Sequence, residues 1–92
     1  MRRFEWDEEK DRTNRRKHGI AFEDAIRIFD GPRLEDVDDR SDYGEMRMTS
    51  VGLMNAVVIV AVAHVDRGEV TRIITARRAT RKERRLYEQR FL

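Results

Sequence analysis

Cysteine is absent from this 92-residue chain, which excludes disulfide bonds and thiolate metal sites and removes any need for an oxidising compartment. Two histidines without cysteine cannot complete a structural zinc site. The ligand series of an EF-hand is broken where Arg40 follows Asp36-x-Asp38. The sequence also lacks a glycine-rich phosphate loop and a nucleophile motif. We therefore expect neither a bound metal nor another cofactor.

Long apolar runs are missing as well. The longest run, Ala56 to Ala63, has eight residues, against the ~18 that a membrane-spanning helix needs. The first ten residues contain no apolar segment of the kind found in signal peptides. Repeats and low-complexity segments do not occur. We expect a cytoplasmic protein with no membrane partner, folded as one domain over residues 1–92.

Charged residues make up 41% of the chain, but apolar residues recur with clear periods, which favours a folded domain over disorder. The charge is unevenly distributed. Residues 67–92 carry nine Lys/Arg against three Asp/Glu, whereas residues 23–45 carry three against nine. A basic segment of this kind is typical of proteins that bind a polyanion such as nucleic acid. The acidic segment can dock a basic partner, but we favour a solvated surface there.

The first predicted helix, residues 8–17, has no apolar stripe. Asp7 can cap its start, and Gly19 can adopt the left-handed conformation that ends a helix. Helical spacing places four polar side chains on one face: Asp7, Asp11, Asn14 and His18. Because apolar packing cannot hold this helix, other contacts must hold it or use it.

Two further helices are predicted. The second contains the stripe Phe22, Ala25, Ile26 and Phe29, with Ala21 as a poor N-cap and a stop at residues 30–32. The last begins with the capping box Thr80-x-x-Glu83 and runs from residue 81 to about residue 90. On this helix we expect Tyr87 to belong to the core.

Strands are predicted over residues 34–37, 46–51, 56–64 and 69–76, with connections at 52–55 and 66–68 and a polar loop over 38–44. The 56–64 strand is apolar on both faces and should lie in the centre of the sheet. Residues 2–6 suit a short edge strand or an anchoring arm. We predict an α+β fold with an antiparallel sheet of about four strands, two N-terminal helices and one C-terminal helix. So small a fold suits an extended polymer better than a buried metabolite.

Arg77 and Arg78 lie between the last strand and the last helix. The N-terminus of that helix also attracts anions, so this junction is a candidate phosphate site. Because neighbouring side chains in a strand point to opposite faces, only one arginine can face the substrate. We expect the other to pair with a carboxylate.

Several blocks of the sequence together resemble the BrnT family. They are Phe4-Glu5-Trp6-Asp7, Asn14-x-x-Lys17-His18-Gly19-Ile20, Phe22-Glu23-x-Ala25, Glu45-x-Arg47 and Arg72-Ile73-Ile74-x-Ala76-Arg77-x-Ala79-Thr80-x-x-Glu83-x-x-x-Tyr87. The resemblance implies a RelE-like ribonuclease toxin of a bacterial type II toxin–antitoxin pair, which cleaves RNA and arrests translation. It also implies a BrnA-type ribbon-helix-helix antitoxin as partner, with operator DNA bound only through that antitoxin. Ala21 departs from the family pattern, which usually has Ser or Thr there, and no particular residue is expected at His64.

Metal-independent RNA cleavage needs a base for the 2′-OH, cations for the charge on phosphorus and an acid for the 5′ oxygen. His18 is a candidate acid or base because its usual pKa is near neutrality, but a histidine at a helix end equally stabilises the helix dipole. Lys17 is a candidate acid or phosphate ligand, and the alternative for it is a solvated surface lysine.

Among the arginines we favour Arg77 for the substrate phosphate, because it matches the family block. Arg47 is the second choice, and Glu45 lies on the same strand face as a further catalytic candidate. The alternative for Glu45 is a structural pair with an arginine. Three other arginines are predicted to bind substrate phosphates: Arg72, Arg78 and Arg81.

Two other functions compete with a metal-independent endoribonuclease. One is a non-catalytic regulator that binds nucleic acid, because the basic segment would serve it equally well. The other is a protein-interaction module that uses the acidic segment. Shortening of RNA would separate an enzyme from a binding protein.

Overall fold

A computed structural model describes residues 2–38 and 45–92. Along these residues the elements are β1 (Arg3–Glu5), α1 (Glu8–His18), α2 (Phe22–Ala25), the 3-10 helix η1 (Ile26–Asp30), β2 (Arg33–Asp38), β3 (Arg47–Leu53), β4 (Ile59–Arg67), β5 (Val70–Arg78) and α3 (Arg81–Phe91). The predicted polar loop lies outside the described residues except for Asp38, which ends β2.

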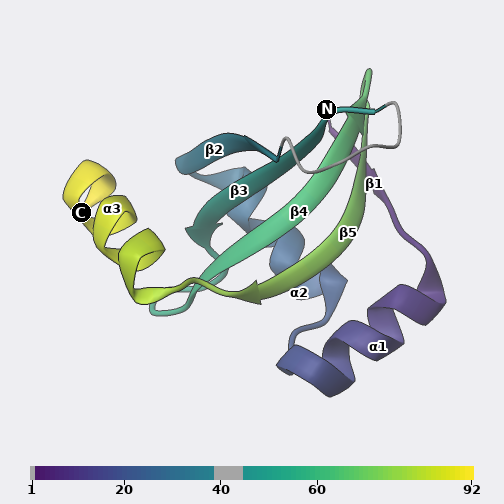
Figure 1. Cartoon of the computed structure of the whole chain (residues 1–92), viewed down its shortest axis with the longest axis horizontal. Coiled ribbons are helices and arrows are strands. Elements are labelled where there is room, and N and C mark those ends of the chain that lie inside the picture. The colour runs from purple at the N-terminus through teal and green to yellow at the C-terminus, as the bar shows by residue number, and fades with distance from the viewer. Residues whose placement is uncertain (1, 39–44) are drawn as a thin grey trace.

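The described strands form a five-stranded mixed sheet in the order β1-β5-β4-β3-β2 (Figure 1). β4 lies in the centre, as its apolar sequence predicted. Arg3–Glu5 forms the short edge strand that was one of the two alternatives for residues 2–6, and it pairs in parallel with Val70–Arg72. The sheet is therefore five-stranded and mixed, whereas about four antiparallel strands were predicted. Such a pairing between distant segments is not visible in the local pattern of either one.

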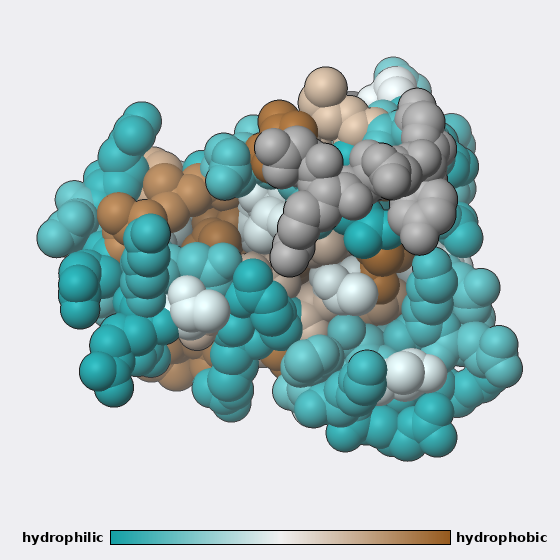
Figure 2. Space-filling model, viewed as in Figure 1, coloured by the Kyte–Doolittle hydropathy of each residue, from teal (hydrophilic) through white to brown (hydrophobic). Residues whose placement is uncertain are grey.

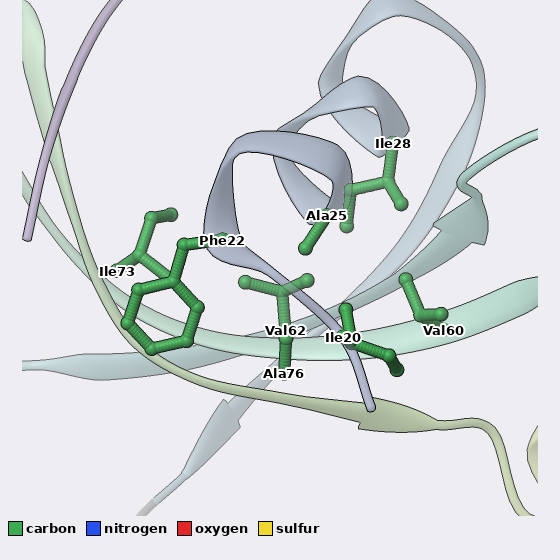
Figure 3. Close-up of a cluster of buried hydrophobic side chains, with 8 residues drawn as sticks. All are labelled: Ile20, Phe22, Ala25, Ile28, Val60, Val62, Ile73 and Ala76. Carbon is green, nitrogen blue, oxygen red and sulfur yellow. The ribbon is translucent and has the colours of Figure 1, made fainter. Parts of the chain in front are cut away.

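The main core lies between the sheet and the α2–η1 segment. Four side chains before and within this segment meet four from β4 and β5 (Figure 3): Ile20, Phe22, Ala25 and Ile28 against Val60, Val62, Ile73 and Ala76. The predicted second helix is therefore present, but it tightens to 3-10 geometry after Ala25. Close packing explains Gly52 on β3, where an added Cβ would lie 3.0 Å from Ile28 Cβ.

The opposite face of the sheet is covered at one end by α3. Tyr87 is fully buried there against Val51, Ile59 and Ala61. Its hydroxyl donates a hydrogen bond to the Pro32 carbonyl at 2.9 Å. Tyr87 is thus a core residue with a satisfied polar atom, as predicted.

Two connections differ from the predictions. Asp66 and Arg67 still pair with β5, so the turn falls at Gly68, which has φ of 63°. β3 continues through Leu53, and the loop that follows is held by the Asn55 side chain, which accepts bonds from two backbone N–H groups. Among the residues described, no helix is long and apolar enough to span a bilayer.

Candidate functional site

Asn14 attaches α1 to the edge of the sheet. β1 pairs only with Val70–Arg72, so within the described residues the outer backbone edge of β5 beyond Arg72 is not covered by a strand. Asn14 binds that edge at Ala76. Its side-chain amide accepts from the Ala76 N–H at 3.0 Å and donates to the Ala76 carbonyl at 2.8 Å, as a neighbouring strand would. A second donation reaches the Ile20 carbonyl at 2.9 Å. Buried polar contacts therefore replace the apolar stripe that α1 lacks.

Asp11 provides a second buried contact from the same helix. Its carboxylate accepts a hydrogen bond from the Phe22 N–H at 2.9 Å. Ala21, the N-cap of α2, makes no side-chain cap bond, so Asp11 satisfies this helix start from outside the helix. The predicted ends of α1 are confirmed: Asp7 accepts from two backbone N–H groups, and Gly19 is left-handed with φ of 69°.

A groove of about 780 Å³ runs between α1 and β5. Lys17 and His18 line it from the last turn of α1, and Ile74 and Thr75 line it from the strand. Both α1 side chains are exposed, and hydrophilic residues cover the region of this helix in Figure 2. The position of His18 suits a proton-transfer group and also a cation at the negative end of the helix dipole.

A hollow of about 310 Å³ adjoins this groove on the sheet face. It is lined by Glu45, Arg47, Arg67 and Arg72, which come from the start of β3, the end of β4 and the start of β5. Lys10 lines both the hollow and the groove, so the two are continuous. Two groups of predicted site residues, distant in sequence, therefore lie along one depression.

The register of the strands places Arg47 and Arg72 on the same face. Each pairs with Val65 of the strand between them. Their backbones are thus two strand spacings apart, about 10 Å. Two guanidinium groups at this separation can approach one phosphate from two sides.

Carboxylates bind two of the three arginines that line the hollow, Arg67 and Arg72. Arg67 donates two hydrogen bonds to Glu45, at 2.6 and 2.7 Å, and Arg72 donates one to Glu5 at 2.9 Å. The bond from Arg67 lowers the pKa of Glu45 below its usual range. The Arg47 Nε, in contrast, is buried and has no hydrogen-bond partner within the described part of the chain. Because this Nε is closed off from solvent, an anion in the hollow would contact the terminal nitrogens of the Arg47 guanidinium.

Arg77 makes two hydrogen bonds to the Glu83 carboxylate, at 2.7 and 3.0 Å. The pairing of one arginine with a carboxylate is as expected, but Arg77 is the paired residue, not Arg78. The reason is the confirmed capping box, which holds Glu83 beside this strand end. The bond from Arg77 lowers the pKa of Glu83. Arg78 and Arg81 are exposed nearby, and the lining of the groove and hollow, as far as the structure describes it, includes none of the three arginines.

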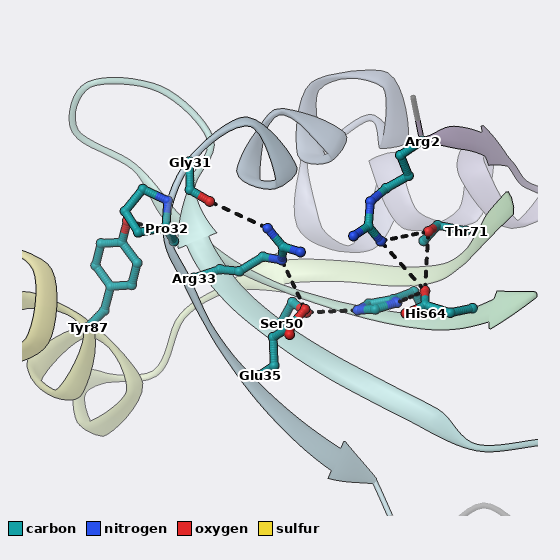
Figure 4. Close-up of polar contacts among 10 residues, drawn as sticks. Arg2, Gly31, Pro32, Arg33, Glu35, Ser50, His64, Thr71 and Tyr87 are labelled. Carbon is teal, nitrogen blue, oxygen red and sulfur yellow. Dashed lines mark hydrogen bonds and ion pairs between the residues drawn. The ribbon is translucent and has the colours of Figure 1, made fainter. Parts of the chain in front are cut away.

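A buried polar network links the strands on the face that α2 covers, and no pattern in the sequence predicted it (Figure 4). His64 Nε2 lies 2.8 Å from Ser50 Oγ, and His64 Nδ1 lies 2.8 Å from Asp66 Oδ1. A carboxylate can only accept, so Nδ1 carries the hydrogen and the Ser50 hydroxyl donates to Nε2. Burial lowers the pKa of His64, although Asp66 acts in the opposite direction.

The order Ser, His, Asp resembles a hydrolytic triad, but Ser50 and His64 are both 0% exposed, so a substrate cannot reach the hydroxyl. The network continues from Asp66 to the Thr71 hydroxyl, which donates at 3.2 Å, and on to Arg2. Its role is to satisfy polar groups across three strands. Within residues 2–38 and 45–92, no three His, Asp or Glu side chains come together as metal ligands.

Comparison with known proteins agrees with this arrangement. The family described as ribonuclease toxin, BrnT, of type II toxin–antitoxin systems matches residues 6–83. The crystal structure of the Brucella abortus ribonuclease toxin BrnT is similar, with a TM-score of 0.64 and 26% sequence identity over 88% of this chain and 100% of that chain. A search of curated proteins gave no match. The family match includes α1, the groove and the sheet-face hollow, and the chain belongs to the BrnT family of type II toxin–antitoxin ribonuclease toxins.

Proposed function

We propose that this chain is a metal-independent endoribonuclease that cleaves RNA in the cytoplasm and so arrests translation. The observation that supports this function best is the depression formed by the sheet-face hollow and the α1–β5 groove. It combines the guanidinium group of Arg47 with titratable side chains at Lys17 and His18. These are the two kinds of group that phosphodiester cleavage requires.

In the proposed reaction the ribose 2′ oxygen attacks the adjacent phosphorus and the bond to the 5′ oxygen breaks. A 2′,3′-cyclic phosphate and a free 5′-OH result. Arg47 and Arg72 bind the phosphate oxygens and stabilise the negative charge that develops on them. The proton of the 2′-OH goes to one titratable group, and another proton is delivered to the departing 5′ oxygen.

His18 and Lys17 are assigned to these proton transfers. Glu45 is a weaker base than an ordinary glutamate, because its hydrogen bonds with Arg67 favour the ionised carboxylate. We therefore assign Glu45 to holding Arg67 in the hollow. Exposed Arg78 and Arg81 bind phosphates outside the reacting one, and the paired Arg77 stabilises the strand end beside them.

The same proposal includes the partner. We infer that residues 1–92 act as one toxin domain and that a BrnA-type ribbon-helix-helix antitoxin binds it. Operator DNA is then contacted through the antitoxin. An antitoxin that covers the depression would block substrate access without altering any catalytic residue.

The test is cleavage of end-labelled RNA by the purified chain. Activity should persist in EDTA, and 2′-O-methyl RNA should bind without being cut, because its nucleophile is blocked. His18→Ala should lower the cleavage rate by ~10²-fold with little change in RNA affinity. Arg47→Ala should lower it by ~10²-fold or more, whereas Arg27→Ala, on exposed η1 surface, should not.

Cleavage of 2′-O-methyl RNA, or loss of activity in EDTA that magnesium restores, would overturn the mechanism. A fully active His18→Ala enzyme would transfer the proton role to Lys17 or Glu45. If the wild-type chain shifts RNA on a gel but never shortens it, the protein is the non-catalytic binding regulator instead.

A further inference from the structure

The depression does not end at His18. A third hollow, of about 370 Å³, is lined by Arg12, Arg15 and Arg16 on the outer side of α1. Arg12 and Arg16 also line the α1–β5 groove, which in turn shares Lys10 with the sheet-face hollow. Shared lining residues thus connect three concave regions into one track in the described part of the molecule.

The charge along this track has mostly one sign. The sheet-face hollow contains three arginines, and the groove adds Lys10 and Lys17. On the outer side of α1, Arg15 lies 3.6 Å from the Asp11 carboxylate and is partly neutralised. Arg12 and Arg16 make no ion pair within the described residues. They lie one turn apart, about 6 Å along the helix axis.

We propose that α1 is an extended binding surface for the RNA backbone, in which Arg12 and Arg16 bind phosphates that are not cleaved. The chemical identity of the ligand rests on the proposed function. A polynucleotide fits this surface because cations outnumber carboxylates along the track: eight Lys and Arg side chains line it, against Glu9 and Glu45. Exposed Arg12 and Arg16 also take no part in the buried hydrogen bonds by which Asp11 and Asn14 attach α1.

Binding of uncleavable 2′-O-methyl RNA tests this proposal by fluorescence anisotropy over a range of salt concentrations. The variant is Arg12→Ala with Arg16→Ala, since alanine preserves the helix. Loss of two phosphate contacts on single-stranded RNA should reduce the slope of log affinity against log salt by about 1.4. Affinity for a long oligonucleotide should fall on the order of tenfold. A short oligonucleotide that fills only the sheet-face hollow should bind variant and wild type equally.

The matched control is Arg27→Ala with Arg90→Ala, which removes the same charge from exposed positions on η1 and α3. It should leave the salt slope within about 0.3 of wild type, because net charge alone makes a small contribution. Equal slopes for the α1 variant and wild type would overturn the proposal and point to an acidic protein segment as the occupant of α1. Equal losses in the α1 variant and the control would overturn it too.

These outcomes are independent of catalysis. If the wild-type chain does not cleave RNA but the α1 variant loses RNA affinity, the proposed enzymatic activity is wrong and the proposed RNA-binding surface on α1 stands. If the wild-type chain cleaves RNA but the α1 variant binds RNA with wild-type affinity, the enzymatic activity stands and the RNA-binding surface on α1 is wrong.

Discussion

His64 is completely buried, but both of its ring nitrogens have hydrogen-bond partners. The free-energy cost of removing imidazole from water is thereby offset for the neutral ring. For the protonated ring, the hydrogen bonds no longer offset the free-energy cost of burial. The Ser50 hydroxyl would have to accept from the ring and could then donate to Glu35, 3.4 Å away. Asp66 and Glu35 favour a charged ring, but burial beside Phe29 opposes the charge more strongly. The folded state therefore favours neutral His64.

This gives a prediction for stability against pH. The folded pKa of His64 lies below its usual value of 6.5 because of burial. As pH falls through that value, the unfolded chain takes up a proton that the folded chain refuses, so the free energy of unfolding should decrease. Urea unfolding at a series of pH values should show this decrease in wild type.

The control separates the two histidines. His64→Gln should lose the decrease in unfolding free energy, while His18→Gln, at an exposed position, should retain it. A decrease that persists in His64→Gln would mean that other groups cause it.

The roles of Tyr87 as a core residue and of Thr80 as a helix cap could both be predicted from their spacing in the sequence. His64 shows what spacing cannot predict, because its partner Ser50 comes from another strand, β3, and the face to which His64 points depends on a β-bulge between Ala63 and His64.

At the scale of elements, α1 is the unusual one. Amphipathic helices are held by an apolar stripe, but α1 is held by Asp11 and Asn14, which are 8% and 5% exposed. Both were placed correctly on one helical face from the sequence. Their partners, the Phe22 N–H and the Ala76 backbone, were not predictable, because the backbone edge that β1 leaves open becomes visible only in the folded sheet.

The attachment of α1 can be measured directly. Asn14→Ala removes three buried hydrogen bonds and leaves the Ala76 and Ile20 backbone groups unsatisfied. The free energy of unfolding should fall by about 2 to 3 kcal/mol. Thr13→Ala, at the adjacent exposed position, should change it by less than about 0.5 kcal/mol. Chemical denaturation of the three proteins gives both values. Unchanged stability in Asn14→Ala, with loss of RNA affinity, would make Asn14 a groove residue and not an anchor.

The strand-to-helix junction shows the same limit of local information. The capping box predicted where β5 ends and α3 begins. The orientation of Arg77 toward Glu83 depends on how the helix turns back over the sheet, and the sequence indicated only that one of two arginines would pair. Elements with local signals were thus predictable, whereas the parallel pairing of β1 with β5 and the pairing of charges were not.

For the whole molecule, the fold separates the two signs of charge that the sequence concentrates in different segments. In the described part of the segment 23–45, the acidic residues before Glu45 lie on α2, η1 and β2, whereas Glu45 lines the cationic hollow and most cations lie on α1, β5 and α3. In Figure 1 α1 lies beside β5, at the edge of the sheet away from β2. A negatively charged ligand is therefore attracted to the depression and repelled from the acidic side, which increases the rate of productive encounter.

The antitoxin and RNA should compete for this cationic side. We expect the cognate antitoxin to lay an acidic segment, or apolar residues, across the open sheet from Arg47 to Arg77. Charge attraction should make association fast and strongly dependent on salt, since screening acts over about 10 Å at 0.1 M ionic strength. Stopped-flow association at several salt concentrations and displacement of labelled 2′-O-methyl RNA measure the two effects. A complex that still binds and cleaves RNA would place the antitoxin elsewhere and remove this surface as the inhibited one.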